Sequence, residues 1–153
     1  MSIDALDQQL SHDLKEAMRA KATIRLEAIR SIRTALTMEK FNAGNHGSLT
    51  DAQVVAVLQR LKKQRQESAD IYHQQNRGDL AGVEEEQLAV IASYLPEMLE
   101  GQALEDALRP LIAQVGASGP GDFGKAMGIC SKAMAGKAEG KAVAEAVKKL
   151  LNS

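Results

Sequence analysis

The chain has 153 residues and a formal net charge of −1, with no tryptophan, two phenylalanines, two tyrosines and one cysteine. This length suits one domain or two small ones, and a single cysteine excludes an internal disulfide framework. With so few aromatic side chains, base stacking is a poor mechanism for binding nucleic acid. No apolar run approaches the ~18 residues of a membrane span, so we expect no membrane partner. With a single cysteine and no secretory signal at the start, we expect a cytoplasmic protein.

Two amphipathic helices are predicted first, because apolar residues recur every three or four positions. The stripe of the first helix, over 3–21, consists of Ile3, Leu6, Leu10, Leu14 and Met18. The stripe of the second, from about 23 to 43, consists of Ile24, Ala28, Ile29, Ile32, Leu36 and Met38. Asn, Gly and Ser residues over 42–48 then predict a loop.

Two further helices are predicted before Pro96. Thr50 and Gln53 have the spacing of a capping box, in which each side chain satisfies a backbone donor of the other residue. The helix that they open carries Val54, Leu58, Leu61, Ser68, Ile71 and Tyr72 and runs to about residue 76. We expect Gly78 to end this helix and Asp79 to cap the next one, which Pro96 ends.

The composition changes after Pro96, where eight of the twelve glycines of the chain occur. Three short helices are predicted, over about 102–115, 122–134 and 139–151, because each of these segments has an apolar face. No segment alternates with the period of a strand, so the fold class is all-α. We expect a larger N-terminal helical domain of about four helices at 1–96 and a small C-terminal three-helix domain at 97–153.

Charge is segregated along the chain. Residues 1–77 have a net charge of +3, residues 78–108 hold eight acids and no base, and residues 109–153 have a net charge of +4. Two basic segments therefore flank an acidic one.

The stretch from Gly119 to Lys125 matches most of the phosphate-binding pattern G-x-x-x-x-G-K. Ala126 stands where that pattern needs a hydroxyl for magnesium, and a helix rather than a strand is predicted before it. We therefore interpret the stretch as a turn between helices, with Asp122 as a helix cap.

The lysines of this region have two interpretations. Lysines at a turn, with glycines that expose the backbone, can contact the phosphates of a polyanion without reading its sequence. Alternatively, they form an ordinary solvated face. The candidate nucleic-acid-binding residues are Lys125, Lys132, Gly136, Lys137, Gly140 and Lys141.

A second basic feature lies on the first three helices, where Arg30 and Arg33 share one face. These arginines could contact phosphate, and the basic residues of this domain could equally pair with the acidic segment 79–106. The histidines at 12, 46 and 73 are scattered, and Cys130 lies on an apolar helix face. We predict no catalytic residue, no metal site and no cofactor.

The chain resembles the GatB/YqeY family over nearly its whole length. The resemblance rests on DLKEAMRAK, RLEAIRSIRTAL, LKKQRQESADIY, RGDLAGVEEEQLAVIASYLPEML and, near the end, GKAMG with AGKAEGKAVAEAVKKLL. The most specific pieces are the KKQRQES run, the segment from Glu86 to Pro96 and the terminal GKAEGK. The family often has Asp where Glu139 stands, and Asp caps a helix better than Glu.

Members of this family are similar to the C-terminal tail of the B subunit of the glutamine-dependent aminoacyl-tRNA amidotransferase, which helps to position tRNA. The resemblance implies a non-catalytic module that binds tRNA, or that associates with the amidotransferase or an aminoacyl-tRNA synthetase. One alternative is a protein-interaction adaptor that docks through the acidic segment 79–106. Another is an accessory of a carbon–nitrogen ligase whose active site lies on a partner.

Overall fold

The computed structural model describes residues 3–42, 44 and 48–152. Within this part of the chain there are seven α-helices and one short 3₁₀ helix, and no strand occurs. The all-α prediction is therefore confirmed. The chain folds into two compact units, residues 1–96 and 97–153.

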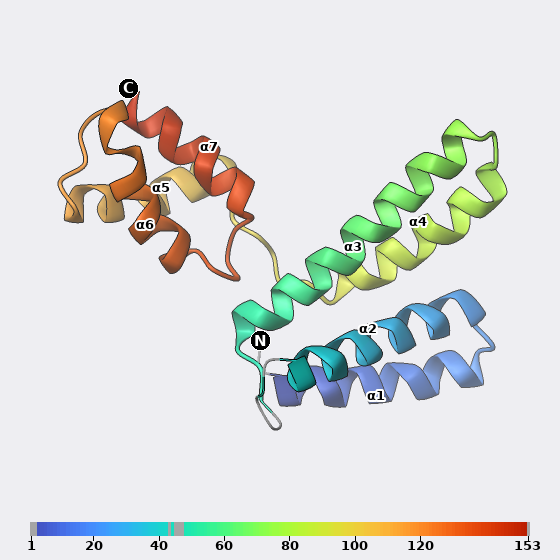
Figure 1. The fold of residues 1–153 in the computed structure, drawn as a ribbon. Coiled ribbons are helices and arrows are strands. Elements are labelled where there is room, and N and C mark those ends of the chain that lie inside the picture. The colour runs from blue at the N-terminus through green and yellow to red at the C-terminus, as the bar shows by residue number, and fades with distance from the viewer. Residues whose placement is uncertain (1–2, 43, 45–47, 153) are drawn as a thin grey trace. The chain divides into compact units, whose positions relative to one another are not determined.

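The first unit contains four helices: α1 (Ile3–Arg19), α2 (Thr23–Asn42), α3 (Asp51–Gln74) and α4 (Gly78–Ser93). Helices α3 and α4 form a long hairpin, α2 packs against both of them, and α1 packs against α2. Figure 1 shows the two antiparallel pairs, α1 with α2 and α3 with α4. The core of this unit is made by apolar side chains that include Leu10, Ile29, Ile32, Leu58 and Ile91.

The second unit contains α5 (Gly101–Gln114), the 3₁₀ helix η1 (Pro120–Asp122), α6 (Phe123–Ala133) and α7 (Gly140–Leu151) (Figure 1). The three α-helices pack against one another around a separate core. That core includes Leu104, Leu108, Cys130, Val143 and Val147. Each unit thus buries apolar surface of its own.

The predicted start of α3 is confirmed in atomic detail. The Gln53 N–H donates to Thr50 Oγ1 at 3.2 Å, and the Thr50 N–H donates to Gln53 Oε1 at 2.9 Å. Two of the free backbone donors at this helix end are thereby satisfied, as a capping box requires. The preceding loop, including His46, falls mostly outside the described residues.

The junction between α3 and α4 differs from the prediction. Asn76, not Gly78, takes the left-handed conformation after α3, with φ of 58°, and the Arg77 N–H donates to the Tyr72 carbonyl at 2.8 Å. Asparagine tolerates this conformation better than most residues. Gly78 is instead the first residue of α4, and Asp79 lies in the first turn, where its carboxylate accepts two hydrogen bonds from Arg77.

Three residues assigned to buried stripes are exposed. Met18 is 53% exposed, Met38 59% and Ile71 51%. All three lie in the second half of a helix, where helical periodicity alone does not show which turns are covered by a neighbouring helix. In the part of the chain that the structure describes, no helix is both long enough and apolar enough to span a membrane.

Candidate nucleic-acid interface

The turn between α6 and α7 is held by backbone hydrogen bonds. The N–H groups of Lys137 and Ala138 donate to the Met134 carbonyl at 2.8 and 3.0 Å. The Leu99 N–H donates to the Lys137 carbonyl at 2.9 Å, which ties the turn to the segment before α5. The backbone of Lys137 is thus fixed while its side chain is exposed. A fixed backbone under an exposed lysine reduces the entropy lost when the lysine binds an anion.

Three of the four predicted lysines lie around this turn. Lys132 lies in the last turn of α6, Lys137 in the connection and Lys141 in the first turn of α7. Lys125 lies near the start of α6, seven positions before Lys132, which corresponds to about 10 Å along a helix axis. All four side chains belong to exposed residues.

Lys148 was not among the predicted residues and lies in the last turn of α7, away from the α6–α7 turn. Lys148 is exposed and lines a small pocket with Pro120, Phe123 and Leu151, so the end of α7 lies beside the start of α6. Lys148 follows Lys141 by seven positions and therefore shares its face of α7. That spacing is the signal that could have identified it.

These lysines are not neutralised within the described chain. No carboxylate of the described residues lies within 4.0 Å of the ammonium groups of Lys125, Lys132, Lys137, Lys141 or Lys148. By contrast, Lys149 pairs with Glu105 at 2.8 Å, and the Glu105 side chain is largely buried. The C-terminal unit therefore presents a set of unpaired positive charges, which favours contact with a polyanion.

The two glycines of the predicted site have different roles. Gly136 has φ of +77°, in the region that side-chain-bearing residues rarely adopt, so the turn itself requires a glycine there. Gly140 is exposed, and a Cβ atom added to it would meet no atom within 4 Å. The same holds for Gly124 and Gly128. Close helix packing therefore explains none of these last three glycines.

The Gly119–Lys125 stretch has the geometry of an interhelical turn. It follows α5 rather than a strand and consists of η1 and the first residues of α6. The Asp122 carboxylate accepts a hydrogen bond from the Ser118 N–H at 3.0 Å and makes no capping bond to α6. Asp122 thus precedes the helix as predicted, but its side chain stabilises the turn before it instead.

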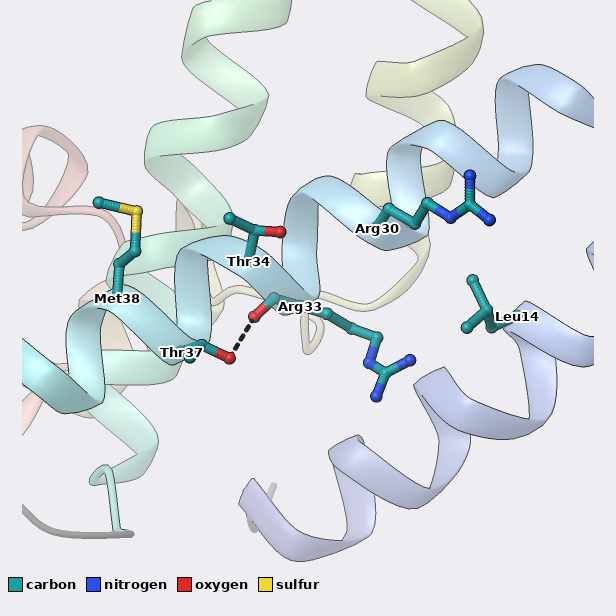
Figure 2. Close-up of a pocket in the computed structure, with 6 residues that line it drawn as sticks. All are labelled: Leu14, Arg30, Arg33, Thr34, Thr37 and Met38. Carbon is teal, nitrogen blue, oxygen red and sulfur yellow. Dashed lines mark hydrogen bonds between the residues drawn. The ribbon is translucent and has the colours of Figure 1, made fainter.

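Most arginines of the first unit have acidic partners. Arg65 lies in a polar network in which it donates to Gln87 Oε1 at 2.9 Å and to Ser31 Oγ at 3.1 Å, with Glu84 at 3.7 Å. Arg19, Arg25, Arg60 and Arg77 also lie within 4.0 Å of carboxylates. Arg30 and Arg33 have no such partner among the described residues, and both line an open groove between α1 and α2 (Figure 2).

The acidic segment is partly engaged within the chain. Asp79, Glu84, Glu105 and Asp106 each lie within 4.0 Å of a lysine or arginine, and Glu85 lies 2.6 Å from the His73 ring. Glu86, Glu97 and Glu100 have no ion pair among the described residues. The negative charge of residues 78–108 is therefore compensated only in part.

The described residues contain no group of three or more His, Cys, Asp or Glu side chains that could hold a metal ion. Cys130 is fully buried in the core of the second unit, and burial raises the pKa of its thiol. A buried neutral thiol is a packing group rather than a nucleophile.

Fold and charge together define an all-helical protein of two units, with unpaired lysines around one interhelical turn. A family model described as Yqey-like protein matches residues 7–151. The chain therefore belongs to the Yqey-like protein family, which agrees with the resemblance seen in the sequence.

Curated relatives carry the name "Altered inheritance of mitochondria protein 41, mitochondrial". The protein of Clavispora lusitaniae is 37% identical over 94 residues, which cover 61% of this chain and 54% of that protein. The protein of Meyerozyma guilliermondii is 30% identical over 114 residues, which cover 73% of this chain and 59% of that protein. The protein of Vanderwaltozyma polyspora is 32% identical over 89 residues, which cover 58% of this chain and 48% of that protein. The matches thus span about half the length of these relatives.

The expectation of a cytoplasmic location is contradicted by these relatives, all three of which are named mitochondrial proteins. The expectation rested on the single cysteine and on the lack of a secretory signal. A single cysteine argues only against a disulfide framework, and it does not distinguish one reducing compartment from another.

Proposed function

We propose that this chain is a non-catalytic RNA-binding module that contacts tRNA through the lysines of its C-terminal unit. The observation that carries the proposal is the set of exposed lysines without described acidic partners around the α6–α7 turn: Lys132, Lys137 and Lys141. Lys125 and Lys148 extend the positive charge toward the other end of the two helices.

The chemistry of the turn suits phosphate rather than bases. Lysine ammonium groups contact phosphates as mobile point charges and carry no base preference. The first N–H groups of α7 receive no capping bond from the Glu139 side chain, and Gly140 leaves the approach to them open. Backbone donors at a helix start add to the attraction of an anion.

Specificity for tRNA then depends on shape. Folded RNA is recognised through its backbone and 2′-hydroxyls at fixed distances, and Lys125 and Lys132 are about 10 Å apart along α6. An array of lysines on a rigid helical unit favours an RNA whose phosphates are held in a matching arrangement. A flexible RNA loses more entropy on binding to the same array.

The test compares binding of the full chain to bulk tRNA and to an unstructured RNA of equal length, at low and near-physiological salt. The variant Lys137→Glu/Lys141→Glu reverses two charges at the turn. The matched control, Lys15→Glu/Lys62→Glu, makes the same charge change at lysines of the first unit that have no described ion pair.

We expect the wild type to prefer tRNA at both salt concentrations, the turn variant to lose this binding and the control to keep it. Equal, salt-sensitive binding to both RNAs would show that the lysines are a general polar surface. Equal loss in the control would show that net charge, and not the α6–α7 turn, governs binding.

A further inference from the structure

A second candidate surface lies on α2 and contains none of the lysines of the C-terminal unit. Residues on one face of α2 recur at spacings of three and four: Arg30, Arg33, Thr34, Thr37, Met38 and Phe41. All six are exposed, whereas the opposite face, with Ile29, Ile32 and Leu36, is buried in the core. We call these six residues the α2 stripe.

The α2 stripe borders an open groove of about 460 Å³. Leu14 of α1 and the first five residues of the stripe line it. Figure 2 shows this face: Arg33 lies at the edge of the stripe nearer α1, and Thr34 and Met38 lie at the edge farther from α1. The Thr37 hydroxyl donates to the Arg33 carbonyl at 2.9 Å, which leaves its oxygen free to accept a further hydrogen bond.

The basic end of the stripe fits carboxylates. Arg30 and Arg33 have no acidic partner within 4.0 Å among the described residues, although the other five arginines of this unit do. A guanidinium group binds a carboxylate through two parallel hydrogen bonds. Two unpaired guanidinium groups one helical turn apart therefore complement two acids one turn apart on another helix.

The other end of the stripe is apolar. Met38 is 59% exposed and Phe41 is 87% exposed. Methionine, phenylalanine and arginine are among the residue types enriched in protein–protein interfaces, and methionine adapts its shape to different partners. An RNA could use the arginines, but phosphates would gain nothing from Met38 or from Leu14. A protein partner uses both ends of the stripe.

We propose that the α2 stripe binds an acidic amphipathic helix of a partner protein. The centres of the arginine pair and of the Met38–Phe41 pair are eight residues apart on α2, which corresponds to about 12 Å. The partner helix therefore carries two acids within one turn and two apolar residues roughly two turns away. This surface shares no residue with the proposed RNA contacts.

The probe is a displayed library of helical peptides with variable surface residues, selected on the full-length protein. The same library is selected in parallel on two stripe variants, Arg30→Glu/Arg33→Glu and Met38→Glu/Phe41→Glu. The charge-matched control is again Lys15→Glu/Lys62→Glu. These substitutions affect exposed or partly exposed side chains, so circular dichroism is expected to show the wild-type fold in each variant. Enriched peptides are then synthesised, and their Kd values are measured with and without tRNA.

We expect the wild type to enrich peptides with paired acids and, two turns away, paired apolar residues. Binding should weaken by about tenfold or more in both stripe variants and change little in the control or in Lys137→Glu/Lys141→Glu. Failure to enrich peptides of this pattern, or equal binding to the stripe variants, would overturn the proposal. It would also be overturned if tRNA displaced the peptides and itself required Arg30 and Arg33, because the stripe would then be an RNA contact.

Discussion

The Tyr94 hydroxyl, at the C-terminal end of α4, donates a hydrogen bond of 2.5 Å to the Asp13 carboxylate on α1. Gln9 donates to the other carboxylate oxygen at 2.9 Å, and Arg25 of α2 lies 3.9 Å from the same oxygen. Asp13 is only 9% exposed. One buried carboxylate thus links the first, second and last helices of the N-terminal unit.

Replacing Tyr94 by Phe is expected to destabilise this unit by about 2 kcal/mol. The variant loses a hydrogen bond to a charged group, and the buried Asp13 oxygen that accepted it is left without a donor. The measurement is the free energy of unfolding of the full chain in urea, followed by circular dichroism. Tyr72→Phe is the matched control, since no hydrogen bond of the Tyr72 hydroxyl occurs among the described residues. If the free energy of unfolding falls equally in the two variants, the Tyr94–Asp13 hydrogen bond does not contribute to the stability of this unit.

The same hydroxyl predicts a loss of stability at high pH. The pKa of Tyr94 is raised well above its usual value. Burial is the largest cause, and the hydrogen bond to Asp13 and the negative charge of Asp13 act in the same direction. Because the folded protein favours the neutral phenol, this contribution is fully present below about pH 10, the ordinary pKa of tyrosine. It is lost as the pH rises from there toward the folded-state pKa. Urea unfolding between about pH 8 and pH 11 is expected to show a steeper decline for the wild type than for Tyr94→Phe.

The fold class could be read from the sequence because each helix carries its own local signals. The period of the apolar residues located all seven α-helices, and Thr50 with Gln53 fixed the start of α3. The end of α3 was misplaced because two residues, Asn76 and Gly78, are both suited to the left-handed position. Local chemistry allows either one, and the structure has Asn76 in this conformation.

The candidate interface was only partly predictable. Exposed lysines near a turn follow from helix boundaries, so Lys132, Lys137 and Lys141 could be named from the sequence. The sequence could not show which arginines lack an acidic partner, because pairs such as Arg65 with Glu84 and Arg60 with Glu39 join residues on different helices. Arg30 and Arg33 could be placed on one face from the sequence, but the apolar end of the α2 stripe could not be identified. Met38 has the spacing of a core residue and is nevertheless 59% exposed.

The salt dependence of RNA binding gives a quantitative test of the lysines. Each phosphate contact releases counterions, so the binding constant K falls as the salt concentration rises. Removing two contacts should reduce the magnitude of the negative slope of log K against log salt by about two. We expect this reduction for Lys137→Ala/Lys141→Ala, measured on tRNA between low and near-physiological salt. Lys15→Ala/Lys62→Ala should leave the slope unchanged. An unchanged slope in the turn variant would place the phosphate contacts elsewhere in the chain.

The predicted domain boundary near Pro96 leads to a test of whether the two compact units are independent folding units. Leu108 is fully buried in the core of the second unit, and Leu58 is fully buried in the core of the first. Truncating either leucine to alanine removes buried apolar contacts and should cost about 3 kcal/mol. In Leu108→Ala, amide hydrogen exchange should accelerate in α5, α6 and α7 while α1–α4 keep their protection. Leu58→Ala should show the opposite pattern, because a cavity in one core leaves the packing of the other core intact. If either variant accelerates exchange equally in both units, they unfold as one cooperative structure, and the boundary near Pro96 does not divide independent domains.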